Sequence, residues 1–197
     1  MDPKLVSDRF AIFMNGFYAA VHLGRRAVET GSFIESVCLS ASVIDAALRI
    51  GLILNHQLQS GTEDIIEDLL HQADDKNIVT ERAIYKRALK QKLIDDTVYR
   101  ELNELHNLRN QVVHRYIISD ITTKQIVEIS ARYANMVHVI NAVVRKIEDE
   151  QLKRGIGMTR SRKIPADEHR KRIEDILEDA MIKKHGDKHP SRKPRDK

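Results

Sequence analysis

The chain has 197 residues, is 42% hydrophobic and 31% charged, and carries a net charge of +4, which is the balance of a folded protein with its own apolar core. A single cysteine, Cys38, excludes an intramolecular disulfide and a cysteine-based zinc finger, and we expect a buried structural thiol there. No uncharged apolar run reaches the roughly 18 residues of a membrane helix, and the first residues lack a signal-peptide pattern, so we expect a cytoplasmic location without membrane contact.

Scarce glycine and proline, together with apolar residues at three-to-four spacing, predict an all-α fold. The first helix is expected over about residues 5–30, and Gly31-Ser32 ends it, with Ser32 available to cap the next helix. That second helix, over about residues 33–58, is apolar around much of its circumference. We therefore predict that it is the central core helix.

Four further helices are expected before the tail. Two are short, over about residues 62–70, with Glu63 and Asp64 in its first turn, and 80–92. A helix capped near Asp95 continues through Tyr116, and a last long helix begins at Asp120. These elements define a predicted helical domain over residues 1–152.

Residues 153–197 form a predicted basic C-terminal extension. Residues 1–150 hold 18 Lys or Arg and 21 Asp or Glu, a net charge of −3, whereas residues 151–197 hold 15 and 8, a net charge of +7. A tail helix is expected over about residues 165–184, with Pro165 at its first position, followed by a disordered end. The tail either binds nucleic acid or a protein partner, such as an antitoxin or a second subunit, or is simply a solvated segment.

The helix that starts near Asp95 has distinct faces when drawn at 100° per residue. An arc of about 120° holds its core residues, which are Val98, Leu102, Leu105, Leu108 and Val112. His106, Asn110 and His114 share a neighbouring face, and we expect His106 to face solvent or a second subunit. Arg109 and His114 lie about 140° apart. Either the helix distorts to bring them together, or two copies of the chain converge at a dimer interface.

The stretch from Leu108 to Tyr116, LRNQVVHRY, resembles the HEPN superfamily, whose hallmark is an Arg, a polar residue, a few variable residues and a His. Tyr116 completes an Arg-x4-His-x-Tyr form, which resembles HEPN toxins paired with a minimal nucleotidyltransferase antitoxin that modifies the tyrosine. The expected helix order over about residues 5–150 is also similar. The resemblance implies a HEPN-like up-and-down helical bundle, here with extra short helices.

The resemblance also implies a homodimeric, metal-independent endoribonuclease, a toxin or anti-phage effector that cleaves RNA such as tRNA. In that chemistry His114 transfers a proton near neutral pH, and Arg109 binds the phosphate and stabilises its added negative charge. Asn110, one turn from His114, can orient the imidazole. The expected products are a 2′,3′-cyclic phosphate and a 5′-hydroxyl, and no cofactor or metal is expected.

Two further residues and two other functions stay open. Asp45 interrupts the apolar run of the central helix, and a similarly placed acid in many HEPN domains implies that it pairs with Arg109 or His114. Tyr116 is a regulatory candidate, but it also falls on the apolar arc and can be a packing residue. The alternatives are a non-catalytic HEPN module that binds nucleotide or RNA or regulates a partner, and a structural scaffold in which Arg109 and His114 lie apart.

Overall fold

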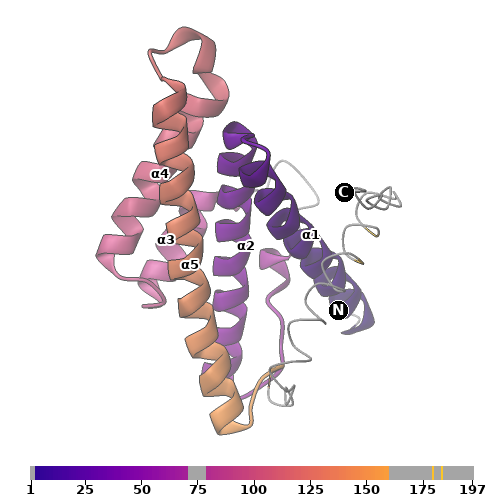
Figure 1. The fold of residues 1–197 in the computed structure, drawn as a ribbon. Coiled ribbons are helices and arrows are strands. Elements are labelled where there is room, and N and C mark those ends of the chain that lie inside the picture. Colours follow the sequence, from indigo (N-terminus) through magenta and orange to yellow (C-terminus); the bar gives the residue numbers. More distant parts are fainter. Residues whose placement is uncertain (1–2, 71–78, 160–178, 180–182, 184–197) are drawn as a thin grey trace, which may run out of the picture.

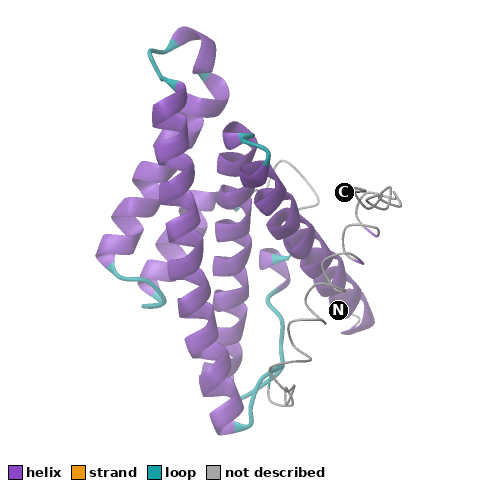
Figure 2. Ribbon diagram, in the orientation of Figure 1, coloured by secondary structure: helices purple, strands orange, loops and turns teal. Residues whose placement is uncertain are grey.

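The computed structural model describes residues 3–70, 79–159, 179 and 183, which form an all-helical bundle without strands (Figures 1 and 2). In chain order, the elements are α1 (Pro3–Glu29), α2 (Phe33–Ser60), the 3₁₀ turn η1 (Glu67–Leu69), α3 (Glu81–Lys90), α4 (Asp96–His114), the 3₁₀ turn η3 (Tyr116–Ile118) and α5 (Thr123–Arg154). The predicted all-α fold is confirmed. Most of the predicted tail helix over residues 165–184 lies outside the described residues.

Helix α2 is the centre of the core and packs against α1, α3, α4 and α5. Its fully buried side chains include Val37, Ile44, Leu48, Leu52 and Ile53. By length and composition α2 is the one described helix that could cross a membrane, but two thirds of its apolar window is buried inside the bundle. Core burial accounts for its hydropathy, and the predicted central helix is confirmed.

Helices α2 and α5 run side by side in the same direction, and α1 and α4 run the opposite way (Figure 1). The hydroxyls of Ser36 and Ser130 lie 2.9 Å apart near one end, and the Gln151 amide donates to the Leu54 carbonyl at 2.8 Å near the other. After α5 ends, Thr159 donates to the Gln151 side chain at 2.7 Å. The packed body therefore continues past the domain boundary predicted at residue 152.

The predicted short helix over residues 62–70 is wrong, because only Glu67–Leu69 is helical and the preceding residues are not. The amide of Gln57 donates to the carbonyls of Glu63 and Asp64, at 3.0 and 3.2 Å. The Thr62 hydroxyl also accepts from the Asp64 backbone N–H at 3.3 Å. These bonds satisfy the backbone without a helical turn, so the acids there do not start a helix.

Helix α4 begins where expected, since Asp95 accepts from the Val98 backbone N–H at 2.8 Å. It ends at His114 rather than at Tyr116. Helix α5 starts at Thr123, three residues later than predicted, because Thr122 forms a capping box with Gln125. The shortening leaves η3 and its neighbours as a projecting tip above α2 (Figure 1).

Candidate functional site

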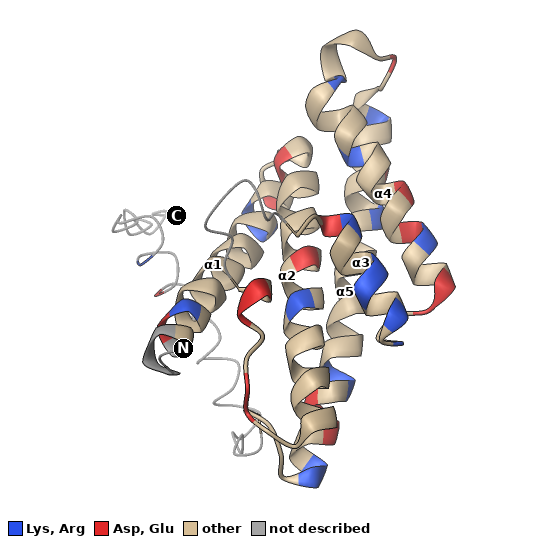
Figure 3. Cartoon of the chain, turned by 180° about the vertical axis from the view of Figure 1, so that it is seen from behind, with Lys and Arg blue, Asp and Glu red and all other residues tan. Residues whose placement is uncertain are grey.

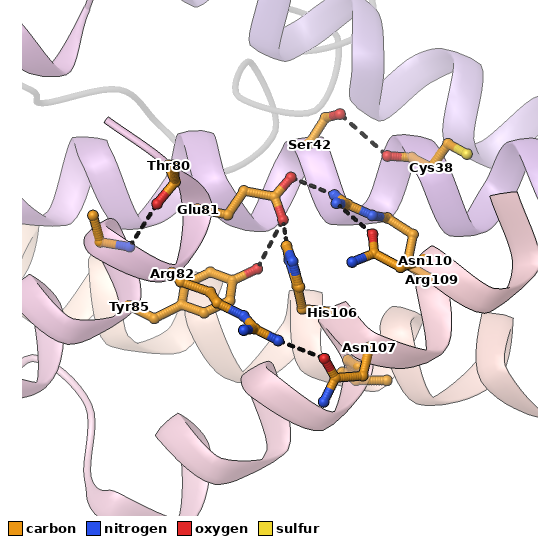
Figure 4. Close-up of polar contacts among 12 residues, drawn as sticks. Cys38, Ser42, Thr80, Glu81, Arg82, Tyr85, His106, Asn107, Arg109 and Asn110 are labelled. Carbon is orange, nitrogen blue, oxygen red and sulfur yellow. Dashed lines mark hydrogen bonds and ion pairs between the residues drawn. The ribbon is translucent and has the colours of Figure 1, made fainter. Parts of the chain in front are cut away.

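The N-terminus of α3 places an acidic side chain beside the motif helix. Thr80 caps α3 by accepting from the Ala83 backbone N–H at 3.3 Å, so Glu81 is the first residue of the helix. A carboxylate in this position is favoured by the free N–H groups and the dipole of the helix. Because α3 packs on both α2 and α4, Glu81 points into the junction of the three helices (Figure 4).

The carboxylate of Glu81 gathers three side chains (Figure 4). One oxygen accepts from Arg109, and the other accepts from Nδ1 of His106 at 2.9 Å and from the Tyr85 hydroxyl at 3.4 Å. A carboxylate only accepts, so Nδ1 of His106 must carry the proton and Nε2 is the nitrogen left to accept. His106 and Arg109 thus share one anion across a single helical turn.

Arg109 lies at the centre of this cluster, with its side chain 20% exposed. Burial lowers its pKa, but the hydrogen bond and negative charge of Glu81 outweigh burial and raise the pKa above the ordinary arginine value. A second guanidinium nitrogen donates to the Asn110 side chain at 3.2 Å. Arg109 is therefore a permanently charged group on a partly open surface, with two of its five N–H donors engaged.

Two supporting residues have other partners than the sequence predicted. Asn110 accepts from Arg109 and makes no hydrogen bond to His114 in the described structure, so its predicted role of orienting His114 is corrected. Asp45 pairs with Arg49 at 2.7 Å on its own helix. The sequence did not identify Glu81, the direct partner of Arg109. The positive charge of Arg109 still lowers the pKa of Asp45 at longer range, after the larger effects of burial, which raises it, and of Arg49.

His114 is exposed at the last position of α4 and makes no hydrogen bond or ion pair within the described residues. The helix is continuous from Asp96 to His114, so the angle of about 140° between Arg109 and His114 persists. Arg109 turns inward to α3, while His114 faces solvent. One chain therefore does not bring the two motif residues together.

His106 does not point freely into solvent, one of the two settings expected for it, because it lies largely buried against α3. Its side chain is 16% exposed and bonds Glu81 from α3. The one signal in the sequence was its spacing of three residues from Arg109, which places both on one side of α4. The contact with Glu81, 25 residues earlier in the chain, has no local pattern to reveal it.

Tyr116 lies in η3 and is 43% exposed, because the helix ends two residues earlier and the predicted apolar arc does not extend to it. Its neighbours Ile117 and Ile118 are 94% and 83% exposed, and Val113 is 40% exposed. We call these four residues, 113 and 116–118, the apolar tip. It lies next to His114.

A pocket of about 620 Å³ opens between α4 and α5, beneath η3. Gln111 and Arg115 line it from α4, Ser119 from the turn and Arg132 from α5. Arg109, Asn110 and His114 do not line it. The pocket thus lies on another side of α4 from the Glu81 cluster.

Cys38 is only partly buried, so the predicted buried thiol is corrected. Burial raises its pKa, and the nearby positive charge of Arg109 partly opposes that shift. Figure 4 places Cys38 on α2 above the cluster. Among the described residues, no group of three His, Cys, Asp or Glu side chains is arranged to hold a metal ion.

Comparisons with protein-family models, with curated proteins and with solved structures found no match to this chain. The resemblance to HEPN domains therefore depends on the sequence alone, through the stretch from Leu108 to Tyr116 and the helix order expected from it.

Proposed function

We propose that this chain is a HEPN-type, metal-independent endoribonuclease that acts as a homodimer on RNA. The observation that carries the proposal is the position of the Arg-x4-His stretch on the last turns of α4. It leaves the imidazole of His114 exposed to solvent and gives Arg109 a partly open, permanently charged guanidinium. An imidazole and an arginine are the groups that attack by a ribose 2′-hydroxyl requires.

The dimer follows from the separation of the two motif residues within one chain. A single α4 directs Arg109 toward α3 and leaves His114 facing solvent, so the two side chains do not converge on one site within a protomer. A second copy that packs against the apolar tip brings its own motif helix to this end of the molecule. Exposed isoleucines at 94% and 83% support such an interface, since apolar patches of this kind mark binding surfaces.

A toxin or defence role, under control of an antitoxin, is part of the same proposal. Tyr116 is 43% exposed, so its hydroxyl is accessible to a modifying enzyme. Residues 153–197, with their basic character, are the proposed segment for a partner protein or for RNA.

The alternative is a non-catalytic module that binds nucleotide or RNA, or regulates a partner. The observation that favours it is the ion pair between Arg109 and Glu81, which already satisfies part of the guanidinium with an internal anion. The separation of Arg109 and His114 in one chain also fits a structural scaffold. The two readings differ from the ribonuclease proposal in predicting no cleavage.

The deciding experiment is cleavage of total RNA and of tRNA in EDTA, with analysis of the product ends. Wild type is compared with an Arg109→Ala/His114→Ala double variant. The matched control is His138→Ala/Arg145→Ala, which removes an exposed histidine and an exposed arginine from α5. We expect 2′,3′-cyclic phosphate ends from wild type and control only. Absence of cleavage by a folded wild-type dimer would reject the ribonuclease proposal in favour of the binding module.

A further inference from the structure

Cleavage by the 2′-hydroxyl needs two proton transfers, one away from the attacking oxygen and one to the leaving 5′-oxygen. The Arg-x4-His stretch offers a single imidazole per chain. We propose that His106 is the general base of the reaction, held in position by Glu81 beside Arg109. This inference depends on the proposed ribonuclease function and names a residue outside the motif that carried it.

The hydrogen bond between His106 and Glu81 sets the state of the imidazole. The Nδ1 atom lies 2.9 Å from the carboxylate and must donate, which leaves the lone pair of Nε2 free to accept a proton. The carboxylate also stabilises the imidazolium that forms once the proton is taken, as an acid partner does in serine hydrolases. Glu81 is thus a positioning residue for His106.

The same carboxylate brings the base and the phosphate-binding group together. Arg109 bonds the other oxygen of Glu81, and the side chains of His106 and Arg109 are 16% and 20% exposed. Each side chain therefore keeps a small part of its surface open to solvent. The three remaining N–H donors of Arg109 are available for a phosphate, so the contact with Glu81 does not exclude binding.

Charged and titratable groups reach the cluster from each packed helix. They are Cys38, Asp45 and its ion-pair partner Arg49 on α2, Glu81 and Tyr85 on α3, Arg109 on α4 and Tyr133 on α5. Burial raises the pKa of both tyrosines, so they stay neutral at physiological pH. Among these side chains, the His106 imidazole is the one that offers a nitrogen lone pair.

Nε2 of His106 takes the proton of the 2′-hydroxyl, and the oxygen forms a bond to phosphorus while Arg109 binds the non-bridging oxygens. The bond from phosphorus to the 5′-oxygen then breaks. The 5′-oxygen takes a proton from a protonated imidazole, the role of His114 in the proposed composite site. The products are a 2′,3′-cyclic phosphate and a 5′-hydroxyl.

The test is the pH dependence of single-turnover RNA cleavage by His106→Asn, His106→Ala and wild type, with His138→Ala as the control histidine on α5. An asparagine amide keeps a donor for Glu81 but removes the basic nitrogen, so folding is preserved while the base is lost. We expect His106→Asn to cleave about 10²–10⁴-fold more slowly, without the rise in rate at acidic to neutral pH. Added imidazole restores part of the rate of His106→Ala.

The outcomes separate the two proposals. Wild-type rate and pH profile in a folded His106→Asn variant would show that His106 is only structural, while the ribonuclease proposal stands. A slow variant whose pH profile keeps its acidic limb, or a His106→Ala variant that imidazole does not rescue, also overturns the role of His106. An inactive wild type removes both proposals. Rescue by imidazole needs only His106→Ala to fold, which melting curves check beforehand.

Discussion

Two carboxylates near Arg109, those of Glu81 and Asp45, differ in their surroundings. Glu81 starts a helix, is 23% exposed and has three donors, two of them from α4. Asp45 lies between helices, and its Oδ1 atom has no hydrogen-bond partner among the described residues. Burial raises the pKa of Asp45, and the charge of Arg49 offsets only part of that effect. The ionised form of Asp45 therefore carries an electrostatic penalty in the folded protein.

This penalty predicts a pH-dependent contribution to stability. Because folding raises the pKa of Asp45 above its ordinary 3.8, the folded state holds the proton more tightly than the unfolded state. The stabilisation is fully present below pH 3.8 and is lost as the pH rises through the folded pKa. Urea unfolding of wild type and Asp45→Asn at several pH values between 3 and 7 measures it.

The difference in unfolding free energy, wild type minus Asp45→Asn, is expected to fall as the pH rises across that range. Taking the difference cancels the other carboxyl groups, which titrate in both proteins. A difference that is flat or rises with pH would contradict the burial of a charge at Asp45 that Arg49 compensates only in part.

The sequence revealed part of the candidate site and could not reveal the rest. Arg109, Asn110 and His114 were singled out because they lie in a short local stretch that resembles the Arg-x4-His hallmark, and α4 contains all three. The ion pair of Arg109 with Glu81 joins residues 28 positions apart, and it depends on how α3 packs on α4. The resemblance suggested Arg109 or His114 as the partner of Asp45, but its spacing of four residues from Arg49 on one helix already allowed the pair that forms.

At the level of the helices, one buried side chain, Gln151, holds the end of α5 and the segment after it against α2. Gln151 is fully buried and bonds Leu54, Gln57 and Thr159. Gly157 has a φ of +74°, and a Cβ there would lie 2.5 Å from the Gln151 amide. The chain can therefore fold back over Gln151 because residue 157 lacks a side chain.

Replacement of Gln151 by Ala is expected to lower the free energy of unfolding by about 1–3 kcal/mol, because the substitution leaves buried polar partners unsatisfied. Chemical denaturation followed by circular dichroism measures the change. Lys146→Ala, at an exposed position of the same helix, is expected to stay within about 0.5 kcal/mol of wild type. Equal effects of the two substitutions would remove the anchoring role of Gln151.

Some helices could be predicted from the sequence and one segment could not. The long helices were predictable because apolar residues repeat along each of them and fill one core around α2. The segment over residues 62–70 was not, because the amide of Gln57 holds its carbonyls out of a helix. A side chain that replaces a backbone partner leaves no periodic signal.

At the scale of the whole molecule, charge and apolar surface lie in different places. Acidic and basic residues are interspersed on α3 and α4 (Figure 3), and residues 1–150 carry a net charge of −3. The described body is therefore not a general polyanion-binding surface, and attraction to RNA depends on local groups such as Arg109. The apolar tip instead offers a surface for protein contact, directly beside His114.

The tip predicts the oligomeric state. If a second copy covers it, Ile117→Asp/Ile118→Asp places charges in the interface and converts the dimer to a monomer at the concentrations where wild type is dimeric. These side chains are 94% and 83% exposed in one chain, so the variant is expected to keep its helical content and melting temperature. Analytical ultracentrifugation gives the mass, and Ile12→Asp, at an exposed apolar position of α1, is the control.

Because the proposed active site needs both copies, RNA cleavage should fall with the dimer fraction. A variant that stays dimeric places the interface elsewhere, and a monomeric variant that cleaves at the wild-type rate rejects the composite site.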